Sequence, residues 1–584
     1  MKLSKRTWLV LMVVALMVGM VFVLAACGEE ETTETTAAGG ATETTAGGAT
    51  ETTAGGATET TAAPTTETTA GGAAGPVEGG TFNVYISEPA FIDTVNLQES
   101  EGTQVGNQLF DSLAKFDYLT GEIMPAAAES WEANEDASVW TFHLVQGAKF
   151  HDGSDVKAAD FKYAWERICN PENESEISYH LSCVLGYDAM QEGTATELEG
   201  VKVVDDYTLE VTLAYPFGDF EFVVGHPALA PVPQAVVEAD PAAFGDKPIG
   251  NGPYMMAEPW AHDQYIKVVK FADYYGPAPH ADGVNFLIFK DDDTAFLEFQ
   301  AGNLDWTTIP SGQVEATKAK YGEAADGMTA APGQQTQTGP ETAVYYILIN
   351  NKDEVLSNTA LRQALSMAIN RQAIIDTIFE GLREPATGIA PWGVAGYTEN
   401  QWAYAKYDVE AAKAKLAEAG FPNGEGLPEI ALSCNSGVGH EDIMAMIQAD
   451  FANIGVTAKI DAVEWAQYLD KLGAGDFMMG RLGWIADYPI IDNFLYPLFT
   501  TGSGDNYSFY SDPAVDEALL DARATVDTDE RIAKYQAIEK TIGEASPVIP
   551  LVMYRMGRVA SERVHNFVLS AQGMLNLEEA WIAE

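Results

Sequence analysis

The sequence predicts a mixed α/β protein whose folded part begins near residue 77 and is long enough for about three domains. Segments 81–86 and 139–144 alternate apolar and polar residues, which is typical of strands. Segment 158–167 carries apolar residues at helical spacing. Segment 408–419 is predicted to be a helix, because Asp408 is a good N-cap and Gly420 a good C-terminal stop.

The net negative charge of the chain limits the kinds of molecule that it can bind. Of its 584 residues, 86 are Asp or Glu and 32 are Lys or Arg, which gives a formal net charge of -54. A nucleic-acid partner is excluded on this ground, because binding phosphates requires a basic surface. The 47% apolar content is that of a globular protein, so the acidity indicates a soluble, self-repelling surface suited to a location outside the cell.

The N-terminus has the pattern of a lipoprotein signal peptide, residues 1–26. Lys2, Lys5 and Arg6 precede an uncharged apolar stretch, 8–23, and then Leu24-Ala25-Ala26-Cys27 reads as a lipobox. We therefore expect lipid on Cys27 and a location at the outer face of the cytoplasmic membrane or in the periplasm. An ordinary signal peptide or a short membrane anchor is the alternative.

Residues 27–76 are predicted to form a disordered tether behind the lipidated cysteine. The octad GGATETTA begins at Gly39, Gly47 and Gly55, and apart from Cys27 and two prolines the segment consists of Thr, Glu, Gly and Ala. Small and polar residues of this kind do not bury enough apolar surface to fold.

The remaining cysteines and the histidines indicate no metal site and no cofactor. Cys169 and Cys183 lie 14 residues apart, and outside the cytoplasm a disulfide between them is plausible. Cys434 is left over and is predicted to be a buried thiol. The chain has no CxxC or HExxH motif, and its eight histidines are scattered.

One stretch, 475–489, combines the groups that a free peptide requires. Its apolar residues 477–479 lie between glycines and predict a short buried strand. Arg481 and Asp487 then lie on either side of residues 483–486. Asp487 is placed to bind the α-ammonium of a peptide, and Arg481 is placed near its carboxylate. The backbone of 483–485 is placed to pair with the peptide as an added strand. The alternative is a strand end at which Arg481 and Asp487 pair with each other.

Several other segments occur in a characteristic order. Together they resemble the extracellular solute-binding proteins of family 5, the receptors for the peptide and nickel ABC importers, over residues 77–584. The segments that carry the resemblance are 128–171, 226–233, 250–254, 274–276, 302–305, 345–353 and the predicted helices 358–370 and 408–419.

This resemblance implies a periplasmic-binding-protein-like type II fold, with two α/β lobes joined by a hinge and an inserted extra domain. Ligand is then enclosed between the lobes when the hinge closes. Matching segments assign 77–112, 240–345 and 553–584 to lobe I, 113–239 to the extra domain and 346–552 to lobe II.

The implied function is that of a monomeric, extracytoplasmic substrate-binding lipoprotein. It would bind oligopeptides and deliver them to the membrane permease subunits of an ABC importer, whose ATPase lies on the cytoplasmic side. Within the same transport role, a nickel complex or an oligosaccharide is the alternative solute, the latter kept open by Trp392, Trp402, Trp465 and Trp484. An enzyme is not expected, because the chain has no GxSxG motif and no evident Cys–His pair.

The family motif Gly-Trp-x-Ala-Asp-Tyr appears here as residues 483–488. The resemblance implies that Asp487 grips the α-ammonium and that the backbone of Gly483 and Ile485 pairs with the peptide, beside the aromatic face of Trp484. Where relatives have a disulfide-bonded cysteine, this chain has Ile485, so that bridge is absent.

Further ligand-binding residues follow from the same resemblance. Arg481 and His440 match family residues that help to bind the carboxylate of peptides of different lengths. Glu101-Gly102-Thr103 matches a loop along the other edge of the peptide. A second family arginine is replaced by Leu472, which leaves the preferred peptide length open.

Overall fold

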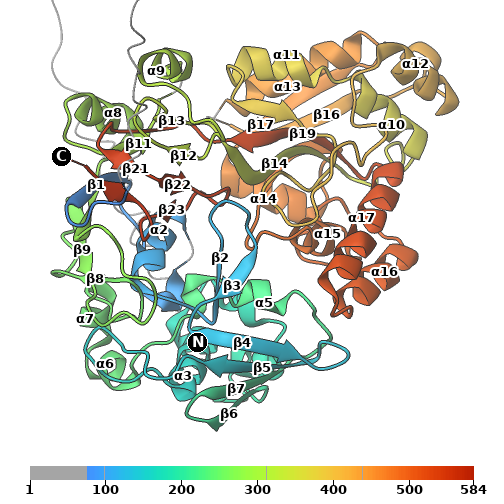
Figure 1. Cartoon of the computed structure of the whole chain (residues 1–584). Coiled ribbons are helices and arrows are strands. Elements are labelled where there is room, and N and C mark those ends of the chain that lie inside the picture. The colour runs from blue at the N-terminus through green and yellow to red at the C-terminus, as the bar shows by residue number, and fades with distance from the viewer. Residues whose placement is uncertain (1–74, 98, 311, 437–438, 584) are drawn as a thin grey trace, which may run out of the picture. The chain divides into compact units, whose positions relative to one another are not determined.

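The computed structural model describes residues 75–583 except 98, 311 and 437–438. Within these residues the fold is mixed α/β, as the sequence predicts, and its three largest sheets have seven, six and four strands (Figure 1). The predicted signal peptide 1–26, the lipidation site Cys27 and nearly all of the tether 27–76 lie outside the described residues. No helix in the described part of the chain is long and apolar enough to cross a membrane.

The seven-stranded sheet is built from the two ends and the middle of the described chain. Its central strand β1 pairs in parallel with β10, and β9, β8 and β20 add antiparallel neighbours. Phe82 and Val84 face one core, whereas Tyr85 faces a smaller one under α8 and α9, as the period of two in a strand requires. The strand order is β13 (Thr336–Gln337), β20 (Arg558–Ala560), β11 (Trp306–Thr308), β1 (Thr81–Ile86), β10 (Gly283–Ile288), β9 (Tyr265–Lys270) and β8 (Tyr254–Met256), with helices α2 (Ser100–Leu109), α8 (Asp292–Gln300) and α9 (Val314–Tyr321).

The four-stranded sheet lies within the segment predicted to be an extra domain. Its inward residues Trp140, Phe142 and Leu144 belong to the same hydrophobic core as Phe82 and Val84 of the seven-stranded sheet. The two sheets are therefore packed as one body. The strand order is β4 (Ala128–Ala133), β5 (Val139–Leu144), β7 (Thr208–Thr212) and β6 (Val201–Asp205), with helices α3 (Ala158–Cys169), α4 (Tyr187–Gln191), α5 (Phe220–Val223), α6 (Gln234–Ala239) and α7 (Pro241–Asp246).

The six-stranded sheet has helices on both faces. Tyr345 and Ile347 of β14 pack with α10–α13, and the intervening Val344 and Tyr346 pack with α14–α17. The strand order is β15 (Arg383–Pro385), β19 (Val548–Arg555), β14 (Pro340–Ile349), β18 (Met479–Ile485), β16 (Ile430–Asn435) and β17 (Ala458–Val463). The helices are α10 (Thr359–Ala368), α11 (Arg371–Ile378), α12 (Val409–Glu418), α13 (His440–Ala452), α14 (Trp465–Ala474), α15 (Asp492–Phe499), α16 (Pro513–Arg523) and α17 (Thr528–Ala545).

Three small sheets complete the fold. Two of them lie near the C-terminus, where the last strands return to the body of the seven-stranded sheet and add Val564, Phe567 and Leu569 to its core. The small sheets are β12 (Thr329–Ala330) with β22 (Phe567–Leu569) and β23 (Leu575–Asn576), β21 (Val564–His565) with β24 (Trp581–Ile582), and β2 (Ala114–Phe116) with β3 (Ile123–Pro125).

The chain passes between the seven-stranded and six-stranded sheets twice. Residues 338–339 connect β13 to β14, and residues 556–557 connect β19 to β20. The two connections are bonded to each other, because the Met556 N–H donates to the Gly339 carbonyl at 3.0 Å. The lobe limits expected at 345 and 552 fall inside β14 and β19 instead, since nothing in a continuous apolar strand marks where a sheet begins.

Local sequence signals predicted several elements correctly. Strands β1 and β5 coincide with the predicted 81–86 and 139–144. Helix α12 has Asp408 as its N-cap, whose carboxylate accepts the Ala411 N–H at 3.0 Å, and Gly420 follows with a φ of +97°.

The disulfide considered between Cys169 and Cys183 is not formed. Both cysteines are free and buried in the hydrophobic core, where burial raises the pKa of each thiol to about 12. The Cys183 thiol donates to the His180 carbonyl at 3.9 Å. Both residues therefore act as small apolar core residues, and Cys434 is likewise a buried free thiol, as the sequence predicts.

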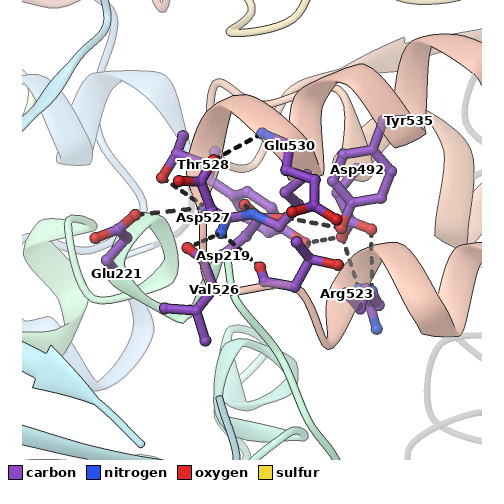
Figure 2. A network of polar contacts seen from close by, with 12 residues as sticks. Asp219, Glu221, Asp492, Arg523, Val526, Asp527, Thr528, Glu530 and Tyr535 are labelled. Carbon is purple, nitrogen blue, oxygen red and sulfur yellow. Dashed lines mark hydrogen bonds and ion pairs between the residues drawn. The ribbon is translucent and has the colours of Figure 1, made fainter. Parts of the chain in front are cut away.

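A buried ion pair joins the body containing the four-stranded sheet to the helices of the six-stranded sheet (Figure 2). Asp219, just before α5, pairs with Arg531 of α17, and both side chains are 0% exposed. The Tyr535 hydroxyl donates to the other oxygen of Asp219 at 2.8 Å, and Glu221 lies 3.5 Å from the Arg531 guanidinium. Every charge in this contact therefore has a partner, as burial requires.

A second set of contacts holds the same segment in place. Arg523 of α16 pairs with Asp492 at 2.7 Å, and its guanidinium lies 4.3 Å from the ring centre of Phe217. The Gly218 N–H donates to the Arg523 carbonyl. Segment 217–221 is thus attached to α16 and α17, and Arg523 in turn connects α16 to α15, although the segment belongs in sequence to the other body.

A buried glutamate on α17 predicts a pH dependence of stability. Glu539 is 1% exposed and accepts the N–H groups of Ile389 and Ala390, and burial raises its pKa to about 7. Because the folded chain then holds this proton more tightly than the unfolded chain, this group's contribution to the free energy of unfolding falls as pH rises from 5 to 8, by on the order of 2 kcal/mol. We expect Glu539→Gln to remove that fall in denaturant titrations at the two pH values.

The exposed Glu544 on the same helix provides the control. Glu544→Gln is expected to keep the pH dependence of the wild type. Equal pH dependence in the two variants would contradict a protonated Glu539.

Candidate functional site

Strand β18 has one side without a strand partner over half of its length. It pairs with β14 antiparallel from Met479 to Ile485, but with β16 only at Met479 and Gly480. Among the described residues no other strand pairs with β18. We call the side of residues 482–485 that faces away from β14 the outer edge of β18.

The backbone groups of Gly483 and Ile485 point to this outer edge. The Ala486 N–H donates to the Thr342 carbonyl at 2.9 Å, so residues 484 and 486 face β14. In an antiparallel pair the intervening residues direct their N–H and C=O groups the other way. The Arg481 carbonyl follows the same alternation, because it accepts the Tyr468 hydroxyl at 2.7 Å on the outer side.

The sequence predicts a short strand at 477–479. The observed strand β18 begins at Met479 and continues to Ile485, so it starts later and is longer than that prediction. The sequence suggested that Gly480 would end the strand. In the structure a Cβ at Gly480 would lie 2.6 Å from the Tyr468 hydroxyl oxygen. The glycine therefore permits close approach of that side chain rather than a turn.

Asp487 lies two residues after the end of β18 and is held by two neutral groups. The Tyr179 hydroxyl donates to one carboxylate oxygen at 3.2 Å, and the Asn493 amide donates to the other at 2.9 Å. The Asn493 oxygen in turn accepts the Asp487 N–H at 3.0 Å and the Trp484 indole N–H at 3.1 Å. These contacts fix the orientation of the carboxylate.

No cation among the described residues lies within ion-pairing distance of Asp487, so it does not pair with Arg481. Burial raises the pKa of Asp487, because a desolvated carboxylate without a counter-charge is disfavoured. An ammonium group placed beside it would supply the missing charge.

Arg481 lies in the first half of β18, and His440 is the first residue of α13. The Arg481 guanidinium donates to Asn435 at 2.8 Å and lies 5.7 Å from the ring centre of Tyr345, whose hydroxyl is 3.3 Å from His440 Nδ1. Burial and then the charge of Arg481 lower the pKa of His440 to about 4. Within β18, four steps of strand separate Arg481 from Ile485, which corresponds to about 13 Å at the usual rise, and Asp487 follows two residues later.

Glu101-Gly102-Thr103 forms the first turn of α2 rather than a loop. Glu99 caps this helix by accepting the Gly102 N–H at 3.0 Å. Glu101 and Thr103 line a cavity of about 440 Å³ together with Ile485 and Asp487. The structure thus brings the α2 segment and the end of β18 to one cavity, of a size typical for small-ligand sites.

The remaining predicted residues lie outside this cavity. Trp484 lines a second cavity of about 350 Å³, which Asp487 also lines, whereas Arg481, Gly483 and His440 line neither. Leu472 is fully buried in the core beneath β18, and Ile485 is 66% exposed. Both positions that depart from the family pattern are therefore apolar here.

The sequence alone did not identify the residues that orient the predicted ligand-binding side chains. Asn493 orients both Asp487 and Trp484, and it lies only six residues from Asp487. Tyr179 is 308 residues away and Tyr345 is 95 residues from His440. No periodicity or motif connects such distant positions. In the described part of the chain no group of three or more His, Cys, Asp or Glu side chains has a geometry suited to a metal ion.

Comparisons with known proteins give a consistent result. A family model described as "Bacterial extracellular solute-binding proteins, family 5 Middle" matches residues 122–506. The oligopeptide-binding protein OppA of Bacillus subtilis (strain 168) is 28% identical over 513 residues, which cover 86% of this chain and 92% of that protein.

Two solved structures show the same fold. The unliganded open form of the periplasmic murein tripeptide-binding protein MppA superposes with a TM-score of 0.77 at 27% identity, covering 87% of this chain and 98% of that one. Haemophilus influenzae OppA in complex with the peptide RPPGFSPFR gives 0.65 at 26% identity, covering 87% and 100%. Of these two, the open form is the more similar.

Proposed function

The chain belongs to family 5 of the bacterial extracellular solute-binding proteins, and we propose that it binds oligopeptides and delivers them to the membrane permease of an ABC importer. The family and the relatives are solute-binding proteins, not enzymes. All three similar proteins named above bind peptides according to their names or titles, one of them in a peptide complex.

The observation that carries this proposal is the outer edge of β18. An extended peptide placed there pairs its main chain with Gly483 and Ile485, as an added strand does at any open sheet edge. The α-ammonium meets Asp487, which has no cation of its own among the described residues. The carboxylate end of the peptide lies toward Arg481 and His440.

Recognition of this kind depends on the main chain and not on the sequence of the peptide. Buried amides and both termini must be bonded, since each unmet group costs free energy. Side chains in a hydrated cavity are accommodated by water that adapts to each of them. We therefore expect broad tolerance of side chains and a strict requirement for a free N-terminus.

Other solutes have less support. A nickel complex requires clustered metal ligands, which the described residues do not provide. An oligosaccharide requires exposed aromatic faces, but Trp402 is 4% exposed within a core and the Arg555 guanidinium lies 4.6 Å from the ring centre of Trp392.

We assign the architecture of the family to this chain, with the hinge at the two connections 338–339 and 556–557. Lobe I then comprises 77–112, 240–337 and 558–584, the extra domain 113–239, and lobe II 340–555. The strand orders of the sheets and the bonding between Gly339 and Met556 support these limits. The core shared between lobe I and the extra domain supports their movement as one body.

The description of the family calls its members extracellular, and this supports a location of the chain outside the cytoplasm. Beyond that, we propose that the protein is a monomer anchored to the membrane by lipid on Cys27. The lipobox Leu24-Ala25-Ala26-Cys27 supports the anchor.

The anchor leads to a direct test. Cys27→Ser is expected to leave the chain without lipid, because the acylated thioether requires the thiol. Detergent partitioning and metabolic labelling with a fatty acid should show a labelled, membrane-bound wild type and an unlabelled variant. A variant that is still labelled and membrane-bound would contradict lipidation at this position.

The function itself is tested by identifying the natural ligand. The protein is purified without denaturation from its source, then denatured, and the released small molecules are analysed by mass spectrometry. Peptides of mixed sequence with free N-termini are the expected result. Oligosaccharides or nickel in their place would favour the alternative solutes.

A further inference from the structure

The cavity that contains Asp487 is strongly acidic. Lys115 pairs with Glu578 at 3.0 Å, so one carboxylate is neutralised by the protein. None of the others has a cation within ion-pairing distance among the described residues. Five carboxylates and one ammonium line the cavity, namely Glu99, Glu101, Asp111, Asp487 and Glu578 against Lys115.

Two histidines in the wall do not offset this charge. The rings of His180 and His226 stack with their centres 4.9 Å apart. Burial lowers the pKa of His180 to about 4 and that of His226 well below its ordinary value. Both rings are therefore neutral near pH 7, and the cavity keeps its net negative charge.

Buried polar atoms without hydrogen-bond partners gather at the same cavity. Three of them belong to side chains that are at least nine-tenths buried: Thr103 Oγ1 (7% exposed), Ser112 Oγ (2%) and His180 Nδ1 (6%). The Gln572 amide nitrogen is a fourth. Buried polar atoms are normally bonded, so their concentration here indicates a polar occupant.

We propose that this cavity receives the side chain of the first residue of the peptide and selects a positively charged one, lysine or arginine. The proposal rests on the proposed function, because Asp487 must hold the α-ammonium at the cavity wall for the first side chain to enter it. Uncompensated carboxylates in a partly enclosed site attract a cation more strongly than the same groups in water. The unpartnered hydroxyl oxygens of Thr103 and Ser112 then accept hydrogen bonds from the charged end of that side chain, whereas the Gln572 amide nitrogen, which is a donor, bonds an accompanying water.

The test compares peptides that differ only in the charge of the first side chain. The full chain is titrated calorimetrically with Lys-Ala-Ala, norleucine-Ala-Ala, Ala-Ala-Ala and Glu-Ala-Ala. Norleucine has the length of lysine without its ammonium, so it separates charge from size. We expect Lys-Ala-Ala to bind at least ten-fold more tightly than norleucine-Ala-Ala, and Glu-Ala-Ala to bind most weakly.

A matched pair of variants connects the preference to the cavity. Glu101→Gln removes a carboxylate of the lining and is expected to reduce the ratio of lysine to norleucine affinity at least three-fold. Glu429→Gln removes an exposed carboxylate ahead of β16 and is expected to leave the ratio unchanged. An unchanged ratio in both variants would assign the preference to charge elsewhere on the molecule and overturn the proposal.

The remaining outcomes separate this inference from the proposed function. Equal binding of lysine and norleucine peptides would overturn the inference while peptide binding itself stands. Tighter binding of Glu-Ala-Ala would do the same. If none of the four peptides binds, and the ligand released from the protein is not a peptide, the proposed function fails and the inference fails with it.

Discussion

Replacing Asp487 by asparagine is expected to weaken binding of a peptide with a free N-terminus by about 2–5 kcal/mol, the usual cost of removing one partner of a buried charged pair. Asparagine keeps the shape of the side chain: its oxygen can still accept the Asn493 amide, and its NH2 group can donate to the Tyr179 hydroxyl, which then accepts instead of donating. Calorimetric titration measures the loss. Asp476→Asn, an exposed change three residues before β18, is the control for net charge and should have little effect.

A thermodynamic cycle that combines the Asp487→Asn variant with an N-acetylated peptide tests whether Asp487 contacts the α-ammonium. Acetylation removes the α-ammonium and should cost the wild type a similar amount of binding free energy, but cost the Asp487→Asn variant much less, because both changes remove the same contact. If the two losses simply add, Asp487 does not meet the ammonium.

Replacing Arg531 by methionine is expected to lower the free energy of unfolding by about 3–5 kcal/mol. The change leaves Asp219 fully buried without its cation, which is the costly way to break a buried pair. Denaturant titration followed by tryptophan fluorescence measures the shift of the unfolding transition.

Lys534→Met on the same helix is the matched control. Lys534 pairs with Asp521 and Glu530, whose side chains are 68% and 62% exposed, so its loss is expected to cost at most about 1 kcal/mol. The double variant Asp219→Asn with Arg531→Met should recover part of the stability. Equal effects of Arg531→Met and Lys534→Met would show that burial adds nothing to the pair.

The sequence predicted those parts of the fold and site that depend on local pattern. Strand β5 was predicted to the residue because its inward residues alternate, and α12 because Asp408 and Gly420 cap it. Asp487 was singled out within a motif whose residues are contiguous in the chain. The extent of β18 was predicted wrongly, because a glycine that allows close packing looks the same in sequence as one that allows a turn.

Contacts between distant residues could not be predicted in the same way. Asp219 and Arg531 are 312 residues apart, and the chain has 86 acidic residues from which the partner of any one arginine could come. Tyr179 reaches Asp487 across 308 residues. Such pairs are selected by how the sheets are packed together, which single-sequence periodicity does not report.

The buried pair between Asp219 and Arg531 also affects which residues can move together when the two bodies move relative to each other. We propose above that the adjacent connections 338–339 and 556–557 are the hinge, and on that proposal the six-stranded sheet and its helices would rotate about them. Segment 217–221 is attached to the far side of that hinge by buried charge. Unless those charges separate, a rotation of the helices carries this segment with it and bends the chain on either side of it. Phe217 and Phe220 of this segment also belong to the hydrophobic core of the other body, so the proposed rotation must either separate the buried charges or withdraw these rings from that core. The buried pair would therefore oppose the opening and closing of the two bodies.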